Sequence, residues 1–203
     1  MSFLRAFRRD QRGTSAAEFA LVAPLMILFL LGIIDVGRFI WHVNEAEKAI
    51  QIGTRWAVAT DMVPSDLYTY SFALSGGVQQ GTVVDQSDFP GVSCAASGTT
   101  ASCTCKGSCA FDLTADPTAF ESIVGRMNEI YAGIGADNVQ IDYDWSGLGY
   151  SGDPNGSDVD PLVTVRVTDL SFRPIFLASI FDLGLPDLSY TLTMEDGQGD
   201  WSN

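Results

Sequence analysis

The longest apolar stretch of the chain lies near its N-terminus. No charged residue occurs between Phe19 and Ile34, and from Thr14 to Ile34 only Glu18 is charged. As a helix rising about 1.5 Å per residue, these 21 residues cover the roughly 30 Å hydrocarbon layer of a bilayer. A cleavable secretory signal has a shorter apolar core followed by a small-x-small motif, and none follows Ile34. The pattern predicts one transmembrane helix over residues 14–35.

The helical pattern continues beyond the apolar stretch. Apolar or small residues recur at intervals of three and four, as they do on one stripe of a helix. We therefore predict one helix from about residue 14 to 60, whose second half offers an apolar stripe to a globular domain. The stripe consists of Val36, Ile40, Val43, Ala46, Ile50, Gly53 and Ala57.

A second helix is predicted in the middle of the chain. Asp116 suits an N-cap and Pro117 suits the first helical position. Helical spacing continues to Tyr131, and Gly133 can end the helix. For residues 61–116, between the two helices, the sequence predicts loop with short strands at most.

Alternating apolar and polar residues predict three strands in the last third of the chain. Such alternation is typical of an antiparallel sheet with one buried face. The long helix is its natural partner, so the expected fold is α+β, with a small antiparallel sheet beside a long N-terminal helix. The strands are predicted at residues 139–145, 163–168 and 188–194.

Two features near the predicted elements have alternative interpretations. Residues 174–185 are unusually apolar for a connection between strands, and either pack in the core as a short helix or form an exposed contact patch. Asp35 and Arg38 follow the apolar stretch and are three residues apart, which favours a local ion pair or anchoring at the membrane interface.

Charged residues before the apolar stretch predict its orientation. Residues 1–13 form a basic leader with four arginines and one aspartate. By the positive-inside rule the N-terminus is cytoplasmic, and residues 36–203 form an extracytoplasmic domain. The expected location is a bacterial inner membrane, crossed once, with the domain in the periplasm.

The junction between leader and span has the layout of a prepilin-type signal. Gly13 is followed by four residues, Glu18 and the apolar stretch. Cleavage between Gly13 and Thr14 would make Glu18 the fifth residue, so the free amine of a neighbouring subunit could pair with it inside the membrane. A carboxylate at mid-bilayer otherwise costs about 2.5–3.5 kcal/mol. The alternative is that Glu18 lies near the cytoplasmic interface and reaches water.

Residues 8–60 resemble the TadE/TadG-like family of Tad (tight adherence, Flp-type) pilus-assembly proteins. A basic run, Arg-Gly, small residues, Glu-Phe-Ala and an early proline carry the resemblance, and a weaker similarity extends over residues 163–165, 172–174 and 191–195. The matching residues are Arg12, Gly13, Ala16, Ala17, Glu18, Phe19, Ala20, Pro24, Gly37, Arg38, Ala49, Gly53 and Arg55.

The resemblance implies a pilin-like domain and a minor pseudopilin-like role in pilus assembly. The implied partners are a prepilin peptidase, cutting between Gly13 and Thr14, and other Tad pilus subunits and assembly proteins. The competing class is an uncleaved, membrane-anchored binding module for a secretin, a polysaccharide or an ion. Retention of residues 1–13 in the native protein would favour that second class.

The charge balance argues against nucleic acid as a partner. The chain has a net charge of −14, and beyond the leader it carries 7 basic and 24 acidic residues, a net charge of −17. Nucleic-acid binding needs a basic footprint, which this balance does not supply. An acidic surface also disfavours lying flat on anionic lipid.

Four cysteines lie close together between residues 94 and 109. Outside the cytoplasm, disulfides persist. A bond between Cys103 and Cys105 would close a small, strained ring, so we expect Cys94 to bond with Cys103 or Cys105, with Cys109 completing the set. A zinc site is the weaker alternative, because no paired C-x₂-C elements and no histidine are nearby.

The segment 149–160 is rich in oxygen-bearing side chains. Asp153, Asn155, Asp158 and Asp160 could supply several of the six to eight oxygens that calcium needs, although their order does not match an EF-hand. Major pseudopilins of type II secretion bind calcium in a comparable loop. These residue types are also ordinary turn formers, and a turn without a cofactor is the main interpretation.

Catalytic motifs do not emerge from the sequence. It has no nucleophile elbow, P-loop, dinucleotide turn or histidine-rich metal motif, and His42 is its only histidine. The sequence therefore predicts a structural protein rather than an enzyme.

Overall fold

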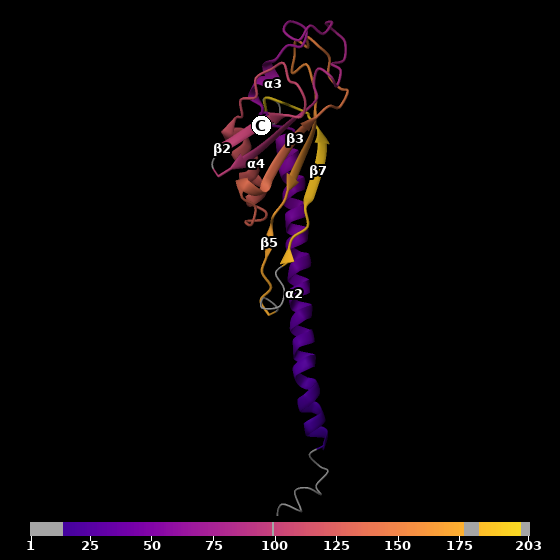
Figure 1. Cartoon of the computed structure of the whole chain (residues 1–203), viewed down its shortest axis with the longest axis vertical. Coiled ribbons are helices and arrows are strands. Elements are labelled where there is room, and N and C mark those ends of the chain that lie inside the picture. The colour runs from indigo at the N-terminus through magenta and orange to yellow at the C-terminus, as the bar shows by residue number, and fades with distance from the viewer. Residues whose placement is uncertain (1–13, 99, 177–182, 200–203) are drawn as a thin grey trace, which may run out of the picture. The chain divides into compact units, whose positions relative to one another are not determined.

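The computed structural model describes residues 14–98, 100–176 and 183–199 (Figure 1). Contacts divide the chain into two compact units. The first comprises Met1–Trp41 with Arg173–Leu183, and the second comprises His42–Phe172 with Gly184–Asn203. The long helix α2 (Thr14–Ala57) contributes to both units, and it confirms the prediction of one helix through residues 14 to about 60.

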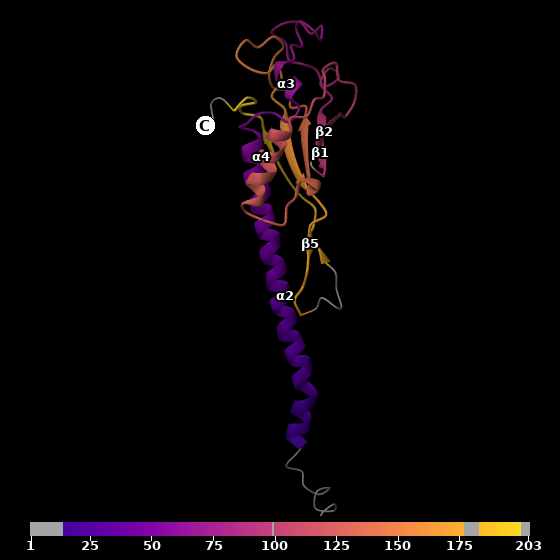
Figure 2. The ribbon, with the colours of Figure 1, turned by 90° about the vertical axis from the view of Figure 1, so that its left-hand side faces the viewer.

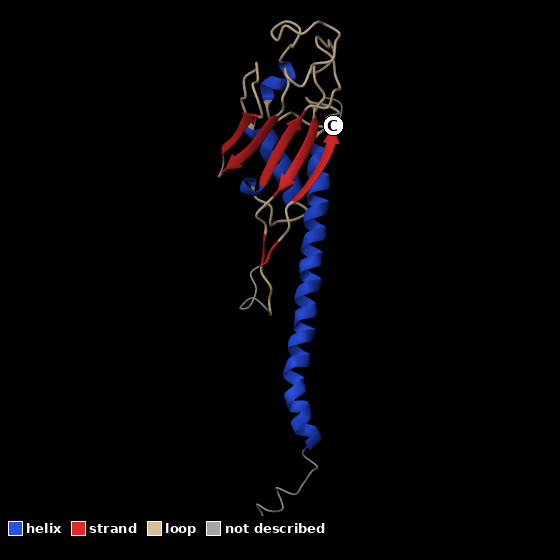
Figure 3. Cartoon of the chain, turned by 45° about the vertical axis from the view of Figure 1, so that its right-hand side comes forward, coloured by secondary structure: helices blue, strands red, loops and turns tan. Residues whose placement is uncertain are grey.

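The second unit is built on a five-stranded sheet (Figure 3). All neighbouring strands are antiparallel, and the spatial order is β2-β1-β3-β4-β7. The three predicted strands are confirmed as β3, β4 and β7. The strands are β1 (Val92–Ser97), β2 (Thr100–Cys105), β3 (Val139–Asp144), β4 (Leu162–Val167) and β7 (Leu188–Thr193).

The β1–β2 hairpin extends this sheet within a segment that the sequence assigned mainly to loop. Its strands consist mostly of Ser, Thr, Ala and Cys, so they lack the contrast between apolar and polar positions that marks a strand. The shorter elements are α3 (Ser65–Thr69), the 3₁₀ turn η2 (Ala136–Asn138), β5 (Ser171–Phe172) and β6 (Leu183–Gly184).

Helix α4 (Pro117–Asn128) begins where the sequence predicts. Asp116 Oδ1 accepts hydrogen bonds from the backbone N–H groups of Thr118 at 2.7 Å and Ala119 at 3.2 Å, which confirms the N-cap. The helix is shorter than predicted, because the chain turns after Asn128. The Asn128 amide donates to the Ile134 carbonyl at 2.8 Å and holds that turn.

The core lies between one face of the sheet and two helices. Figure 2 shows α4 beside the C-terminal part of α2, with both on the same side of the sheet. The side chains between these layers are almost fully buried, as the hydrophobic effect requires of a small domain. They include Ala46, Ala49, Ile50, Val92, Cys94, Phe120, Ile123, Met127, Ile141, Tyr143, Val163 and Val165.

Gly53 allows the close approach of α2 and α4. A Cβ atom at this position would overlap the side chain of Met127, which is fully buried and has little room to move. We expect Gly53→Ala to lower the free energy of unfolding by about 1–2 kcal/mol, because overpacking outweighs the gain in helix propensity. Denaturant unfolding of the full chain in detergent measures this change.

Gly125 provides the matched control on α4. Nothing lies within 4 Å of a Cβ built there. Gly125→Ala is therefore expected to raise the free energy of unfolding by about 0.5–1 kcal/mol. Equal effects of the two substitutions would contradict the packing described for Gly53.

The opposite face of the sheet carries a buried carboxylate. Asp142 on β3 is 2% exposed, and its oxygens lie 3.3 Å from Lys106 Nζ and 3.5 Å from Arg166 Nη2. Burial by itself raises the pKa of Asp142. Hydrogen bonds with Gln140 and Ser93 and the charge of Lys106 outweigh burial, so the net pKa is lowered.

The lowered pKa predicts a loss of stability in acid. The ionised carboxylate contributes stability above its unfolded pKa of about 3.9, and this contribution disappears as pH falls through the lower folded pKa. We expect Asp142→Asn to cost about 1–3 kcal/mol at pH 7 and to weaken the pH dependence below about pH 4. The free energy of unfolding measured from pH 7 to pH 2 tests both expectations. Asp144→Asn is the control, because Asp144 also pairs with Lys106 but is more exposed, and its effect should be smaller.

Candidate functional site

The N-terminal part of α2 presents an apolar surface on all its sides. Eleven large apolar side chains between Phe19 and Ile34 are at least 50% exposed, with Leu21 at 76% and Phe29 at 67%. A helix that is apolar all round is stable only in lipid or among other helices. By length and composition this helix can cross a membrane.

Glu18 interrupts this surface one turn after the helix begins. Its side chain is exposed, and among the described residues it has no hydrogen-bond or ion-pair partner. The carboxylate is thus accessible to a group from outside the chain. Thr14 is the first residue of α2, whereas Gly13 and the rest of the predicted leader lie outside the described residues.

Asp35 marks the other end of the apolar stretch, within the first unit. It is 3% exposed, and its Oδ1 lies 3.6 Å from Arg38 Nη1, which confirms the predicted ion pair. Its Oδ1 accepts a hydrogen bond from the Ile175 backbone N–H at 2.9 Å, and its Oδ2 accepts one from Phe176 at 2.8 Å. The sequence did not indicate this second role, because these partners lie 140 residues further along.

Of the two alternatives for the apolar segment after β5, the described residues Pro174 to Phe176 match the exposed patch rather than the core-packed helix. Pro174, Ile175 and Phe176 are not helical, and the Ile175 and Phe176 side chains are 60% and 44% exposed rather than packed in the core. Residues 177–182, which the prediction also covered, lie outside the described residues.

The four cysteines form two disulfides in the second unit. Cys94 bonds with Cys103, directly opposite on β2, and Cys105 bonds with Cys109 after the strand. Of the two partners left open for Cys94, the structure therefore has Cys103. No free cysteine occurs among the described residues, so in this state no thiolate is available to zinc.

Hydrogen bonds within the acidic segment 149–160, and one from Phe72, hold this loop, for which the sequence favours a turn over a calcium site. Asp158 is 4% exposed, and its two oxygens accept the backbone N–H groups of Phe72 at 2.6 Å and Asp153 at 3.0 Å. Asp153 in turn accepts the N–H of Asn155 at 2.8 Å. These contacts are typical of carboxylates that stabilise turns.

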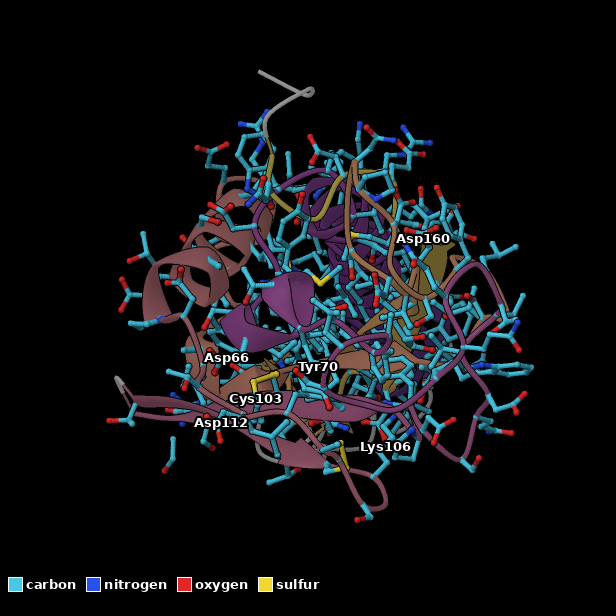
Figure 4. The ribbon with its side chains drawn as sticks, turned by 90° about the horizontal axis from the view of Figure 1, so that it is seen from above. Asp66, Tyr70, Cys103, Lys106, Asp112 and Asp160 are labelled. Carbon is cyan, nitrogen blue, oxygen red and sulfur yellow. A yellow bond between two sulfur atoms is a disulfide. The ribbon has the colours of Figure 1, made fainter. Side chains whose placement is uncertain are left out.

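Asp160 lies close to Asp153 in the same loop. Burial first, and then the charge of Asp153, raise the pKa of Asp160. Within the described part of the chain, no group of three or more His, Cys, Asp and Glu residues is arranged to hold a metal. Figure 4 shows Asp160 well apart from Cys103 and Lys106, so the acidic loop and the disulfide hairpin form separate regions.

The comparison with known protein families gives a match that covers most of α2. A model of the TadE-like protein family matches residues 13–55. Over these residues the chain is similar to that family. The match includes Glu18, the whole exposed apolar surface and Asp35, so the described candidate residues on α2 all lie inside it. No curated protein and no solved structure matches the chain.

The TadE-like match gives the candidate surface a broad function. It suggests involvement in Tad pilus assembly. One apolar N-terminal helix that can span a membrane is consistent with anchoring such a protein.

Proposed function

We propose that this TadE-like protein is a minor pseudopilin-like subunit of a Tad (Flp-type) pilus, anchored in the bacterial inner membrane. The observation that carries the proposal is the TadE-like match over residues 13–55, a region whose apolar helix surface is exposed in the single chain. Its N-terminus is cytoplasmic, its C-terminal domain is periplasmic, and it needs neither a cofactor nor nucleic acid.

Insertion and processing are the first steps of the proposed mechanism. The helix enters the membrane with the arginines of residues 1–13 on the cytoplasmic side. A prepilin peptidase then cleaves between Gly13 and Thr14. Cleavage leaves a free amine at Thr14, the first residue of α2.

Glu18 guides the packing of neighbouring subunits. Its exposed carboxylate has no partner among the described residues, and an unpaired charge is costly in lipid. Pairing with the Thr14 amine of an adjacent subunit would neutralise both charges. The apolar side chains around Glu18 then pack against those of other pilus helices.

The periplasmic domain presents the part of the subunit that meets assembly proteins. Its two disulfides suit an oxidising compartment, where such bonds persist. Cys94–Cys103 joins β1 to the edge strand β2, and Cys105–Cys109 ties the segment after β2 to the end of that strand.

Counting surface pili in cells that lack the native gene tests this function. Cells carrying Glu18→Gln should have at least about tenfold fewer pili, since a tenfold change needs only about 1.4 kcal/mol of lost pairing. Glu47→Gln, on an exposed part of α2 beyond the apolar stretch, is the matched control and should restore normal numbers. Both variants should accumulate equally in the membrane.

Two results would count against the proposal. Normal piliation without any copy of the gene would refute a role in pilus assembly. Normal piliation with Glu18→Gln would refute the pairing role of Glu18 and favour a fixed, membrane-anchored module.

A further inference from the structure

Two exposed apolar side chains in the first unit have no role in the helix packing proposed above. Ile175 is 60% exposed and Phe176 is 44% exposed, and they are adjacent in the sequence. Adjacent large apolar side chains on a surface indicate a contact with lipid or with another protein.

Asp35 determines the position of Ile175 and Phe176 along the axis of α2. Its carboxylate binds the backbone N–H groups of both residues, at 2.9 Å and 2.8 Å. Asp35 directly follows Ile34, the last residue of the charge-free stretch. If residues 14–34 span the hydrocarbon layer, the two hydrogen bonds hold Ile175 and Phe176 at its outer boundary.

The hydrogen bonds to Asp35 also make non-helical backbone tolerable at the edge of the hydrocarbon layer. Backbone N–H groups near lipid are costly when they are unpaired, since no water is there to satisfy them. Asp35 satisfies two successive N–H groups of the segment, while Arg38 lies 3.6 Å from the same carboxylate. The Ile175 and Phe176 side chains can therefore face lipid while the backbone N–H groups of both residues remain hydrogen-bonded.

Residues further along α2 fit a boundary at this level. Trp41 is 66% exposed and lies six residues after Asp35, which is about 9 Å along a helix. Tryptophan is enriched at membrane–water interfaces, at the level of the lipid headgroups.

We propose that Ile175 and Phe176 form a second membrane contact, inserting among the lipid acyl chains at the outer edge of the bilayer while Asp35 holds their backbone against α2. The partner is lipid rather than a protein, because the hydrogen bonds to Asp35 place the pair beside the end of the apolar stretch of α2. This inference rests on the membrane insertion of α2 in the proposed function. It adds a contact made by a segment that lies 140 residues after Asp35 in the sequence.

Photo-crosslinking of the full chain in nanodiscs of phosphatidylethanolamine and phosphatidylglycerol tests the contact. The photoreactive residue p-benzoylphenylalanine replaces Phe176 in one sample. It replaces Phe29, in the middle of the span, in a positive control, and Leu74, an 89% exposed residue of the second unit, in a negative control. Mass spectrometry then measures the fraction of each protein that carries a lipid adduct.

The expected result is lipid labelling at positions 29 and 176 that is several-fold above labelling at position 74. Adding Asp35→Ala should bring labelling at position 176 down to the level at position 74, while labelling at position 29 stays unchanged.

The controls separate failure of this inference from failure of the proposed function. Labelling at position 29 but not at 176, or crosslinks from 176 to protein alone, would overturn the second contact and leave membrane insertion intact. Labelling at 176 that persists with Asp35→Ala would overturn the role of Asp35. Absence of labelling at position 29 would overturn both insertion and the contact that rests on it.

Discussion

Asp158→Ala is expected to lower the free energy of unfolding by about 3 kcal/mol, because it removes a buried charged acceptor from two backbone donors. Without the carboxylate, the Phe72 N–H loses its 2.6 Å hydrogen bond at a residue that is only 1% exposed. The Asp153 N–H loses its partner as well. Denaturant unfolding of the full chain in detergent, followed by tryptophan fluorescence, measures the loss.

Asp153→Ala is the matched control in the same loop. Asp153 is more exposed, and its carboxylate accepts the local N–H of Asn155 and interacts with the exposed hydroxyl of Tyr150, so the expected cost is below about 1 kcal/mol. Calcium or a chelator should leave the unfolding midpoint of the native chain unchanged. A midpoint that calcium raises in the native chain but not in Asp158→Ala would instead establish the loop as a calcium site.

Removal of the Cys94–Cys103 disulfide by the double change Cys94→Ala and Cys103→Ala should cost about 3 kcal/mol. The bond closes a loop between residues nine apart, for which chain entropy gives about 2.7 kcal/mol, and Cys94 is also fully buried. The double change avoids leaving one free thiol. The same unfolding assay measures the cost.

The second disulfide provides a comparison for the first. Cys105 and Cys109 are only four residues apart, so the corresponding double change should cost about 2 kcal/mol. A cost below about 1 kcal/mol for the Cys94–Cys103 pair would show that the hairpin does not depend on its cross-link. It would also weaken the argument that this domain is suited to an oxidising compartment.

Local sequence patterns predicted the elements whose signals are strong and regular. The apolar stretch and the stripe after it gave α2, alternation gave β3, β4 and β7, and Asp116 with Pro117 gave the start of α4. In each case the chemistry that forms the element lies within the element or beside it.

Contacts between distant segments could not be predicted in the same way. The partners of Asp35 lie on a segment 140 residues away, and the partner of Gly53 lies on another helix. The sequence placed Gly53 on the apolar stripe, whereas the structure shows that it makes room for Met127. The sequences of strands β1 and β2 show no alternation of apolar and polar residues, so these strands were not predicted. The cysteine spacing did limit the expected partners of Cys94 to Cys103 and Cys105, and the structure has Cys103.

The candidate site was predictable as far as it depends on local spacing. Gly13, Thr14 and Glu18 follow one another within six residues, so the proposed processing and pairing can be derived from the sequence. The exposure of Glu18 and of the surrounding apolar side chains required the structure.

Proteolytic processing is the central event in the proposed function, and the N-terminal residue of the native protein tests it most directly. Mass spectrometry of the protein from its source membrane would identify that residue, beside a Gly13→Ala variant. We predict an N-terminus at Thr14 in the native protein and no such product in the variant. An intact start at Met1 or Ser2 in the native protein would contradict processing and favour an uncleaved membrane-anchored module.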